Sequence, residues 1–208
     1  MRRSTPLATA LLLGFVACVG PSSSAVQAQE LDVDVSEIGY VLGDAAAPVT
    51  VVEFGDFACG ACAEFWRDTW PQVRTTFVET GRVRWRHVPF LLGFDRGDDA
   101  ANAAECAADQ GQFWAMHDRL FQGQSEWTRE RRHEDILLRY ASEIGLDTEE
   151  FEDCYDDERG EDRTEDATRA ARRAGVRGTP TFYINGVPAL GALSFDQFTA
   201  VVEEAEQG

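Results

Sequence analysis

Short apolar runs alternate with apolar residues at helical spacing along this chain, and together they predict a mixed α/β protein. Residues 49–54 are compact and rich in β-branched side chains, which predicts a buried strand. Between Ala61 and Thr80 the apolar residues recur at helical spacing, with a kink expected at Pro71. Residues 82–89 alternate arginine with apolar side chains and predict a second strand. A strand, a helix and a strand joined by short connections are typical of a βαβ unit.

The second half of the chain predicts helices first and a return to sheet afterwards. Residues 98–175 have an almost continuous helical pattern. Sheet signals return at residues 181–184, and Asn185-Gly186 predicts a tight hairpin turn into another strand at Val187. Ser194 can cap a last helix. This order predicts a small sheet domain interrupted by a helical insertion at about residues 97–174.

The beginning of the chain has the pattern of an export signal. Two arginines precede an apolar run over residues 7–19, and small or polar residues follow, which predicts a signal peptide over residues 1–28, cleaved after Ala28. The four residues that end at Cys18 loosely resemble a lipoprotein box, so a lipid anchor at Cys18 is an alternative, and a retained membrane anchor is another. We expect an extracytoplasmic mature chain over residues 29–208, periplasmic or in the cell envelope, without stable membrane insertion.

The charge composition of the chain excludes some classes of binding partner. The 208 residues carry 37 acidic side chains and 19 basic ones, all of them arginine, for a net charge of −18. A nucleic-acid binder needs an excess of basic side chains, so we expect no nucleic-acid partner. The same charge disfavours attraction to an anionic membrane surface. Residues 30–44 are acidic and weakly patterned, and we expect them to be a surface lead-in.

Four of the five cysteines lie beyond the predicted signal, and an even number in an exported protein favours disulfides. Cys59-x-x-Cys62 falls at the junction between a predicted strand and a predicted helix. The free N–H groups of a helix N-terminus stabilise a thiolate, so we expect an exposed, attacking Cys59. Cys62, one turn further in, would resolve the mixed disulfide. The pair is the predicted redox-active disulfide.

A zinc half-site and an inert structural bridge are the alternatives for this pair. Zinc needs four ligands, and Cys106 and Cys154 form no second close pair. The three histidines, His87, His117 and His133, are scattered along the chain. We therefore expect no bound metal.

Two motifs together resemble a known family. Glu53-Phe54-x-x-Phe57-x-Cys59-x-x-Cys62 follows a predicted strand, and Gly178-Thr179-Pro180-Thr181-Phe182 precedes a predicted hairpin. This combination is similar to thioredoxin-fold proteins. With the helical segment between the motifs, the chain resembles the DsbA-like exported thiol:disulfide oxidoreductases over roughly residues 38–204. The resemblance implies an α/β, thioredoxin-like fold with an inserted helical domain.

The resemblance also implies roles for further residues. Thr179-Pro180 matches a cis-proline loop that faces the disulfide in this family; an ordinary proline at a strand start is the alternative. Glu53 matches a buried acid that takes the proton of Cys62, and the alternative is a strand-end acid that reaches solvent. Cys106 and Cys154 match a second, structural disulfide, against two buried free thiols as the alternative.

One departure from the family pattern bears on the direction of the reaction. DsbA-like proteins usually carry proline after the first cysteine, and the strongest oxidants follow it with histidine, whereas Gly60-Ala61 stands here. This departure does not favour a strongly oxidising potential, and a milder oxidant is an alternative. We expect an oxidase more than a reductase, with a disulfide isomerase or reductase as alternatives. A non-catalytic protein that handles metal through Cys59 and Cys62 is the competing class. We expect no cofactor, and as partners exported proteins with free thiols or disulfides and a membrane redox protein.

Overall fold

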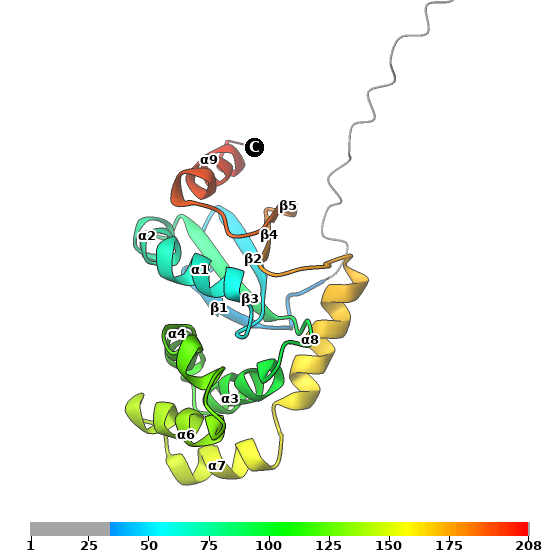
Figure 1. The fold of residues 1–208 in the computed structure, drawn as a ribbon. Helices are drawn as coiled ribbons and strands as arrows, with labels where there is room; N and C mark the ends of the chain where they lie inside the picture. The colour runs from blue at the N-terminus through cyan, green and yellow to red at the C-terminus, as the bar shows by residue number, and fades with distance from the viewer. Residues whose placement is uncertain (1–33, 208) are drawn as a thin grey trace, which may run out of the picture.

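The computed structural model describes residues 34–207, which fold around a mixed five-stranded sheet (Figure 1). The strand order is β1-β3-β2-β4-β5. β2 and β3 run parallel, as the predicted βαβ unit requires, and the other neighbouring strands are antiparallel. The strands are β1 (Tyr40–Leu42), β2 (Val49–Gly55), β3 (Val83–Pro89), β4 (Thr181–Ile184) and β5 (Val187–Leu190). The predicted signal peptide and Cys18 lie outside the described residues.

Helices cover both faces of the sheet. Alternate residues of β2 point to opposite faces, so Val49 and Val51 pack against α1 (Gly60–Asp68), α2 (Trp70–Val73) and α9 (Phe195–Ala205). Val52 and Phe54 pack on the other face against α8 (Glu161–Arg173) (Figure 1). The Ser194 side chain caps α9 by accepting a hydrogen bond from Gln197 N–H, which confirms the predicted cap.

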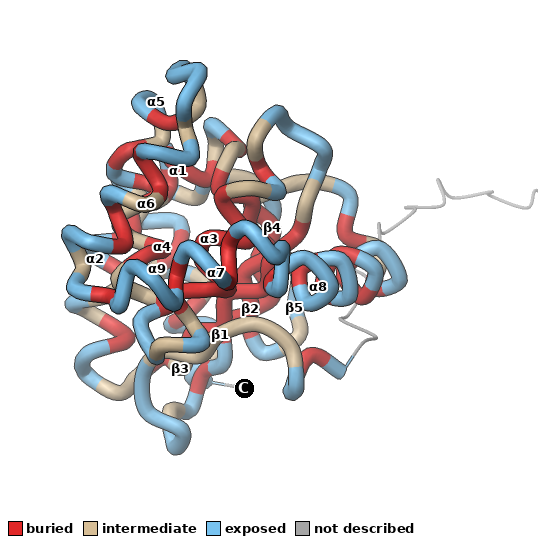
Figure 2. Tube along the Cα trace, turned by 90° about the horizontal axis from the view of Figure 1, so that it is seen from below, coloured by how far each residue is buried: buried red, intermediate tan, exposed pale blue. Residues whose placement is uncertain are grey.

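The segment between β3 and β4 is entirely helical, apart from its connections. It contains α3 (Gly97–Asp109), α4 (Phe113–Gln122), α5 (Gln124–Trp127), α6 (His133–Glu143), α7 (Thr148–Asp156) and α8. We call this segment the helical insertion. Its helices build a second core beside the sheet, and Figure 2 shows the buried residues concentrated where the elements face one another. The predicted thioredoxin-like fold with a helical insertion is confirmed.

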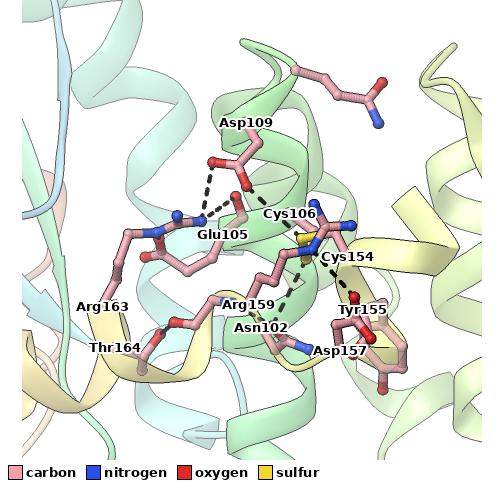
Figure 3. Close-up of a disulfide and its surroundings, with 12 residues drawn as sticks. Asn102, Glu105, Cys106, Asp109, Cys154, Tyr155, Asp157, Arg159, Arg163 and Thr164 are labelled. Atoms are coloured by element: carbon pink, nitrogen blue, oxygen red, sulfur yellow. Dashed lines mark hydrogen bonds and ion pairs between the residues drawn. A yellow bond between two sulfur atoms is a disulfide. The ribbon is translucent and has the colours of Figure 1, made fainter. Parts of the chain in front are cut away.

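A disulfide joins two helices of this insertion (Figure 3). Cys106 in α3 and Cys154 in α7 are bonded with an S–S distance of 2.02 Å and a Cα–Cα distance of 5.8 Å. Beside it, the Asn102 side chain donates to the Tyr155 carbonyl and accepts from Gly160 N–H, at 2.9 and 3.0 Å. The alternative of two free thiols at these positions does not describe this structure.

Two local expectations need correction. The lead-in is not all surface, because Tyr40–Leu42 forms the edge strand β1, paired with β3, and Tyr40 stacks on Phe113. The helix expected up to Thr80 divides at Thr69, before Pro71, and ends in a π-helical turn, η1 (Arg74–Val78). Within residues 34–207, no helix has both the length and the apolar character needed to cross a membrane.

Candidate active site

Cys59 and Cys62 lie where β2 leads into α1, at the carboxyl end of the two parallel strands. Cys59 is the N-cap residue of α1, and Cys62 lies in the first turn of that helix. No disulfide joins the two sulfur atoms here, so the pair is in its dithiol form. This arrangement places the Cys59 sulfur beside the unpaired N–H groups of a helix start, as the spacing of the motif requires.

The expected exposure of Cys59 is wrong. Cys59 is 5% exposed and Cys62 is 1% exposed, so both are buried and Cys62 lies deeper. Cys59 is covered because the loop before β4 folds over it, with the Thr179 carbonyl oxygen 3.4 Å from the Cys59 sulfur. The side chain of Phe57 belongs to the same buried cluster as both cysteines. The loop before β4 and Phe57 therefore limit access to the Cys59 sulfur.

The surroundings separate the acidities of the two thiols. The pKa of Cys59 is lowered from 9.0 to about 6, chiefly because the Cys62 thiol donates a hydrogen bond to it. The Thr179 hydroxyl and the N–H groups of Cys62 and Ala61 lower this pKa further, against the opposing effect of burial. Burial raises the pKa of Cys62 far above the ordinary range, and the charges of Cys59 and Glu53 add to the rise. At neutral pH, Cys59 is a thiolate and Cys62 keeps its proton.

The loop that covers Cys59 contains a cis peptide bond between Thr179 and Pro180. Pro180 directly precedes β4, so the loop is anchored in the sheet beside β2. The Thr179 hydroxyl is buried and has no hydrogen-bond partner among the described residues. A thiolate at Cys59 can accept from this hydroxyl, which agrees with its effect on the pKa of Cys59.

This hydroxyl gives a direct test of the site. Thr179→Val keeps the shape of the side chain and removes a donor to the thiolate, a contribution of about 1.5 kcal/mol. We expect the pKa of Cys59 to rise by about one unit, and the rate of its alkylation at pH 6 to fall about sevenfold. Thr181→Val is the matched control, because the Thr181 hydroxyl donates instead to the Gly178 carbonyl, at 2.7 Å. An equal effect of both substitutions would contradict the assignment.

Glu53 lies in the middle of this half of the sheet. It occupies the same face of β2 as Val49 and Val51, so the pleat directs it toward the core, and it is 4% exposed. The alternative of a strand-end acid that reaches solvent is therefore wrong. One carboxylate oxygen accepts a hydrogen bond from Trp85 Nε1 at 3.2 Å and lies 3.1 Å from His87 Nδ1. The charge of Glu53 is thus paired, as a buried carboxylate requires.

Two histidines that seemed scattered belong to this site. His87 is directly opposite Glu53 in the register of β2 and β3, and His117 reaches the same place from α4. The sequence analysis missed both residues. For His87, the equal lengths of β2 and β3 and their parallel pairing were the available signal. For His117 there was none, because its position depends on how the helical insertion packs. His133 lies apart, paired with Asp99 at 2.6 Å.

The sequence analysis also missed Gln124, which supports the active-site turn from the helical insertion. Its side-chain amide donates to the carbonyl oxygens of Phe57 and Cys59, at 2.7 and 3.0 Å. Gln124 begins α5, so the helical insertion holds the turn that carries the attacking sulfur. Asp56 braces the other side of this turn by accepting from Ala58 N–H and Leu92 N–H, at 2.9 and 3.0 Å.

Comparison with known proteins identifies the family. Residues 36–204 match a family model described as Thioredoxin, and the chain belongs to this family. The oxidised BdbD structure from Bacillus subtilis is similar, with 26% identity, a TM-score of 0.79, and coverage of 87% of this chain and 99% of that one. Alpha-DsbA1 of Wolbachia pipientis shares the fold, with 24% identity, a TM-score of 0.75, and coverage of 86% and 96%. The chain is thus a DsbA-like member of the thioredoxin-fold family.

Curated relatives give a different kind of match. A Na(+)/H(+) antiporter NhaA 3 from Salinispora tropica is 40% identical over 168 residues, which are 80% of this chain and 24% of the antiporter. An NhaA antiporter from Herminiimonas arsenicoxydans is 35% identical over 83% of this chain and 26% of the antiporter. The chain thus spans about a quarter of the length of these relatives.

Proposed function

We propose that this protein exchanges disulfides with exported proteins through Cys59 and Cys62, and that it acts as an oxidase more than as a reductase. A substrate thiolate attacks the sulfur of Cys59 in the oxidised pair, and Cys62 leaves with the electron pair and takes up a proton. A second substrate thiolate then attacks the substrate sulfur and releases the Cys59 thiolate. The substrate gains a disulfide, and the pair gains two electrons and becomes a dithiol.

The lowered pKa of Cys59 is the observation that carries this proposal. Its thiolate is the leaving group when the substrate is released, and a leaving group of low pKa departs faster. It also stabilises the reduced protein: this contribution is present above the ordinary thiol pKa of 9.0 and is lost as the pH falls through about 6. A stabilised reduced form makes the oxidised pair a stronger oxidant, which favours the oxidase direction.

The surface around the pair suits protein substrates. Leu92 and Phe94 are large apolar side chains, 36% and 44% exposed, in the connection between β3 and α3. The Leu92 backbone is tied to the active-site turn through Asp56. A hollow beside the cis-proline loop is lined by residues that include Pro180, Tyr183 and Leu190. An extended, unfolded chain can pair with this loop and place apolar side chains on both patches.

The setting of this reaction is part of the proposal. The dithiol must pass two electrons to an acceptor after each turn, and we assign this step to a membrane redox partner. The predicted signal peptide places the mature chain, residues 29–208, outside the cytoplasm, with a lipid anchor at Cys18 as the alternative to cleavage after Ala28. Cell fractionation and mass spectrometry of the mature N-terminus would decide between these two forms.

The direction of the reaction can be tested with purified protein. The oxidised protein is mixed with a reduced, unfolded substrate protein, and the new substrate disulfides are counted after acid quenching. We expect stoichiometric oxidation by the wild type and none by Cys59→Ser. Equilibration of the pair with glutathione gives its potential, which we expect to be less negative than about −230 mV. A value near the −270 mV typical of thioredoxin would overturn the oxidase direction and leave disulfide exchange itself intact.

A further inference from the structure

A buried cluster of titratable side chains lies beside the active site, and the exchange steps above assign it no role. It consists of Glu53 in β2, His87 in β3 and His117 in α4, and the most exposed of the three is Glu53 at 4%. One ring nitrogen of each histidine and one carboxylate oxygen of Glu53 lie within 4.8 Å of one another. Burying three such groups in a largely aromatic core is costly, which favours a functional role.

The cluster continues to the protein surface through Asp118. His117 Nδ1 lies 3.1 Å from an Asp118 carboxylate oxygen, and the Asp118 side chain is 32% exposed. At the inner end, Glu53 lies 3.1 Å from His87 Nδ1. The two imidazole rings between these ends have their centroids 5.0 Å apart. A series of proton-carrying groups therefore leads from β2 to solvent.

The two histidines have the free ring nitrogens that such a series needs. Nε2 of His87 and Nε2 of His117 are both buried, and neither has a hydrogen-bond partner among residues 34–207. The Nδ1 atom of each ring is the one that contacts a carboxylate. An imidazole can accept a proton at one nitrogen and release another proton at the other nitrogen. Among the described residues no hydrogen bond joins the two rings, so transfer of a proton between them requires a shift of one ring.

We propose that His87, His117 and Asp118 form a proton relay that connects Glu53, and through it Cys62, with solvent; the family resemblance already implies the first transfer, from Cys62 to Glu53. This inference rests on the proposed disulfide exchange. When Cys62 resolves a mixed disulfide, its S–H proton passes to Glu53 while its sulfur bonds to Cys59 and the substrate thiolate leaves. The proton then moves through the two histidines to Asp118 and into solvent. In the opposite direction, the relay returns a proton to the Cys62 thiolate as it is expelled from the disulfide.

Cys62 depends on such a relay because water cannot reach it directly. It is 1% exposed, and its raised pKa means that its sulfur cannot hold a charge for long. The Glu53 carboxylate is close enough for its charge to contribute to that raised pKa. Glu53 itself is 4% exposed, so a proton that it accepts must leave through its own neighbours.

The charges around the cluster agree with these roles. Burial raises the pKa of Glu53, but His87 foremost, with the hydrogen bond from Trp85, lowers it more, so Glu53 is an ionised base. Burial lowers the pKa of His117, which is therefore neutral and able to accept a proton. Among the described residues, the other titratable or charged groups near the cluster are Cys59 and Cys62 at the start of α1, Asp56 in the turn after β2, and Arg74 in η1, which lies 3.0 Å from Asp118.

One carboxylate and two imidazoles could also ligate a transition metal ion. Two observations favour the relay. The Glu53 oxygen nearest the cluster is already held by Trp85 Nε1 and His87 Nδ1. Aromatic rings also surround the histidines, since Phe57 and Phe113 each pack against both of them. The metal content of the purified protein is therefore part of the test.

The test separates attack by Cys59 from resolution by Cys62. Reduced protein is mixed with oxidised glutathione, samples are quenched with acid, and intact mass follows the glutathione adduct on Cys59. Its second-order formation reports the proposed function, and its first-order decay reports proton loss from Cys62. The variants are His117→Gln and Asp118→Asn. Because the Asp118 side chain is partly exposed, Asp118→Asn should fold even if the substitution of the buried His117 prevents folding. His133→Gln is the matched control, because His133 also pairs with an aspartate but lies outside the relay.

We expect His117→Gln to slow the decay of the adduct about tenfold or more at pH 7, and Asp118→Asn to slow it in the same sense. The decay rate of both variants should rise more steeply with pH than that of the wild type, because hydroxide must then remove the proton. Formation of the adduct should be unchanged in all variants, and His133→Gln should match the wild type. If the adducts of Asp118→Asn and of folded His117→Gln decay at the wild-type rate, the relay is wrong and the exchange function stands. Zinc bound stoichiometrically to the purified wild type, and lost in His117→Gln, would also overturn the relay. Absence of adduct formation in the wild type would instead overturn the proposed function.

Discussion

Replacing Cys62 with alanine is expected to turn this protein into a trap for its substrates. Cys59 would still attack, because its low pKa also rests on the helix start and on Thr179. The mixed disulfide would then persist, since no internal thiol remains to resolve it. Cys59→Ala should trap almost nothing, because the remaining sulfur is 1% exposed and its pKa is far above the working range. Non-reducing electrophoresis and mass spectrometry of the captured proteins would measure the difference.

The acidity behind this asymmetry can be measured separately. Limited alkylation of the reduced wild type should modify Cys59 at least about a hundredfold faster than Cys62, with a pH midpoint of about 6. Because the Cys62 thiol is the first cause of the low pKa, this midpoint should rise in Cys62→Ala. Modification of Cys62 first, or equal trapping by both variants, would show that the roles of the two sulfurs are assigned wrongly.

Removing the disulfide of the helical insertion is expected to lower the free energy of unfolding and to leave the reactivity of Cys59 unchanged. The bridge between Cys106 and Cys154 closes a ring of 48 residues, and constraining the unfolded chain in this way contributes about 4 kcal/mol to the free energy of unfolding. We expect the double variant Cys106→Ala, Cys154→Ala to lose about this amount in urea denaturation of the folded protein. The alkylation midpoint of Cys59 should stay at about 6, because neither cysteine of the bridge contributes to its pKa.

The single variants supply the control for this prediction. Each single substitution already breaks the bridge, so Cys106→Ala and Cys154→Ala should each lose about as much stability as the double variant. A loss below about 1 kcal/mol would contradict a stabilising role for the bridge. A shift of the Cys59 midpoint in the double variant would contradict separate roles for the two cysteine pairs.

The elements that could be predicted from the sequence are those whose structure is decided by residues adjacent in the chain. The strand at residues 49–54, the start of α1 at the cysteines and the cap at Ser194 are local patterns, and the structure has all three. The edge strand at Tyr40–Leu42 could not be predicted in this way, because its short, partly buried run becomes a strand only by pairing with β3. Propensity is a weak guide where a distant partner decides the structure.

The errors at the site have the same origin. Cys59 is covered by a loop 120 residues away in the sequence, so its burial is a tertiary property that the motif cannot show. The histidines at 87 and 117 are far from Glu53 along the chain and meet it only through strand pairing and helix packing. The chemistry of the cysteine pair was therefore readable from the sequence, whereas the groups that surround it were not.

The packing of the redox pair has a consequence for how this protein can be engineered. Cys59, Cys62 and Phe57 belong to the buried cluster formed by the helices between β3 and β4, and not to the cluster on the sheet. Gln124 ties those helices to the backbone of the same turn. Deletion of residues 97–174 would therefore expose both sulfur atoms to water. It would also remove the Gln124 hydrogen bonds that hold the turn between β2 and α1. We therefore expect the sheet and the helical insertion to unfold together, and deletion of the insertion to destroy the site rather than to simplify it.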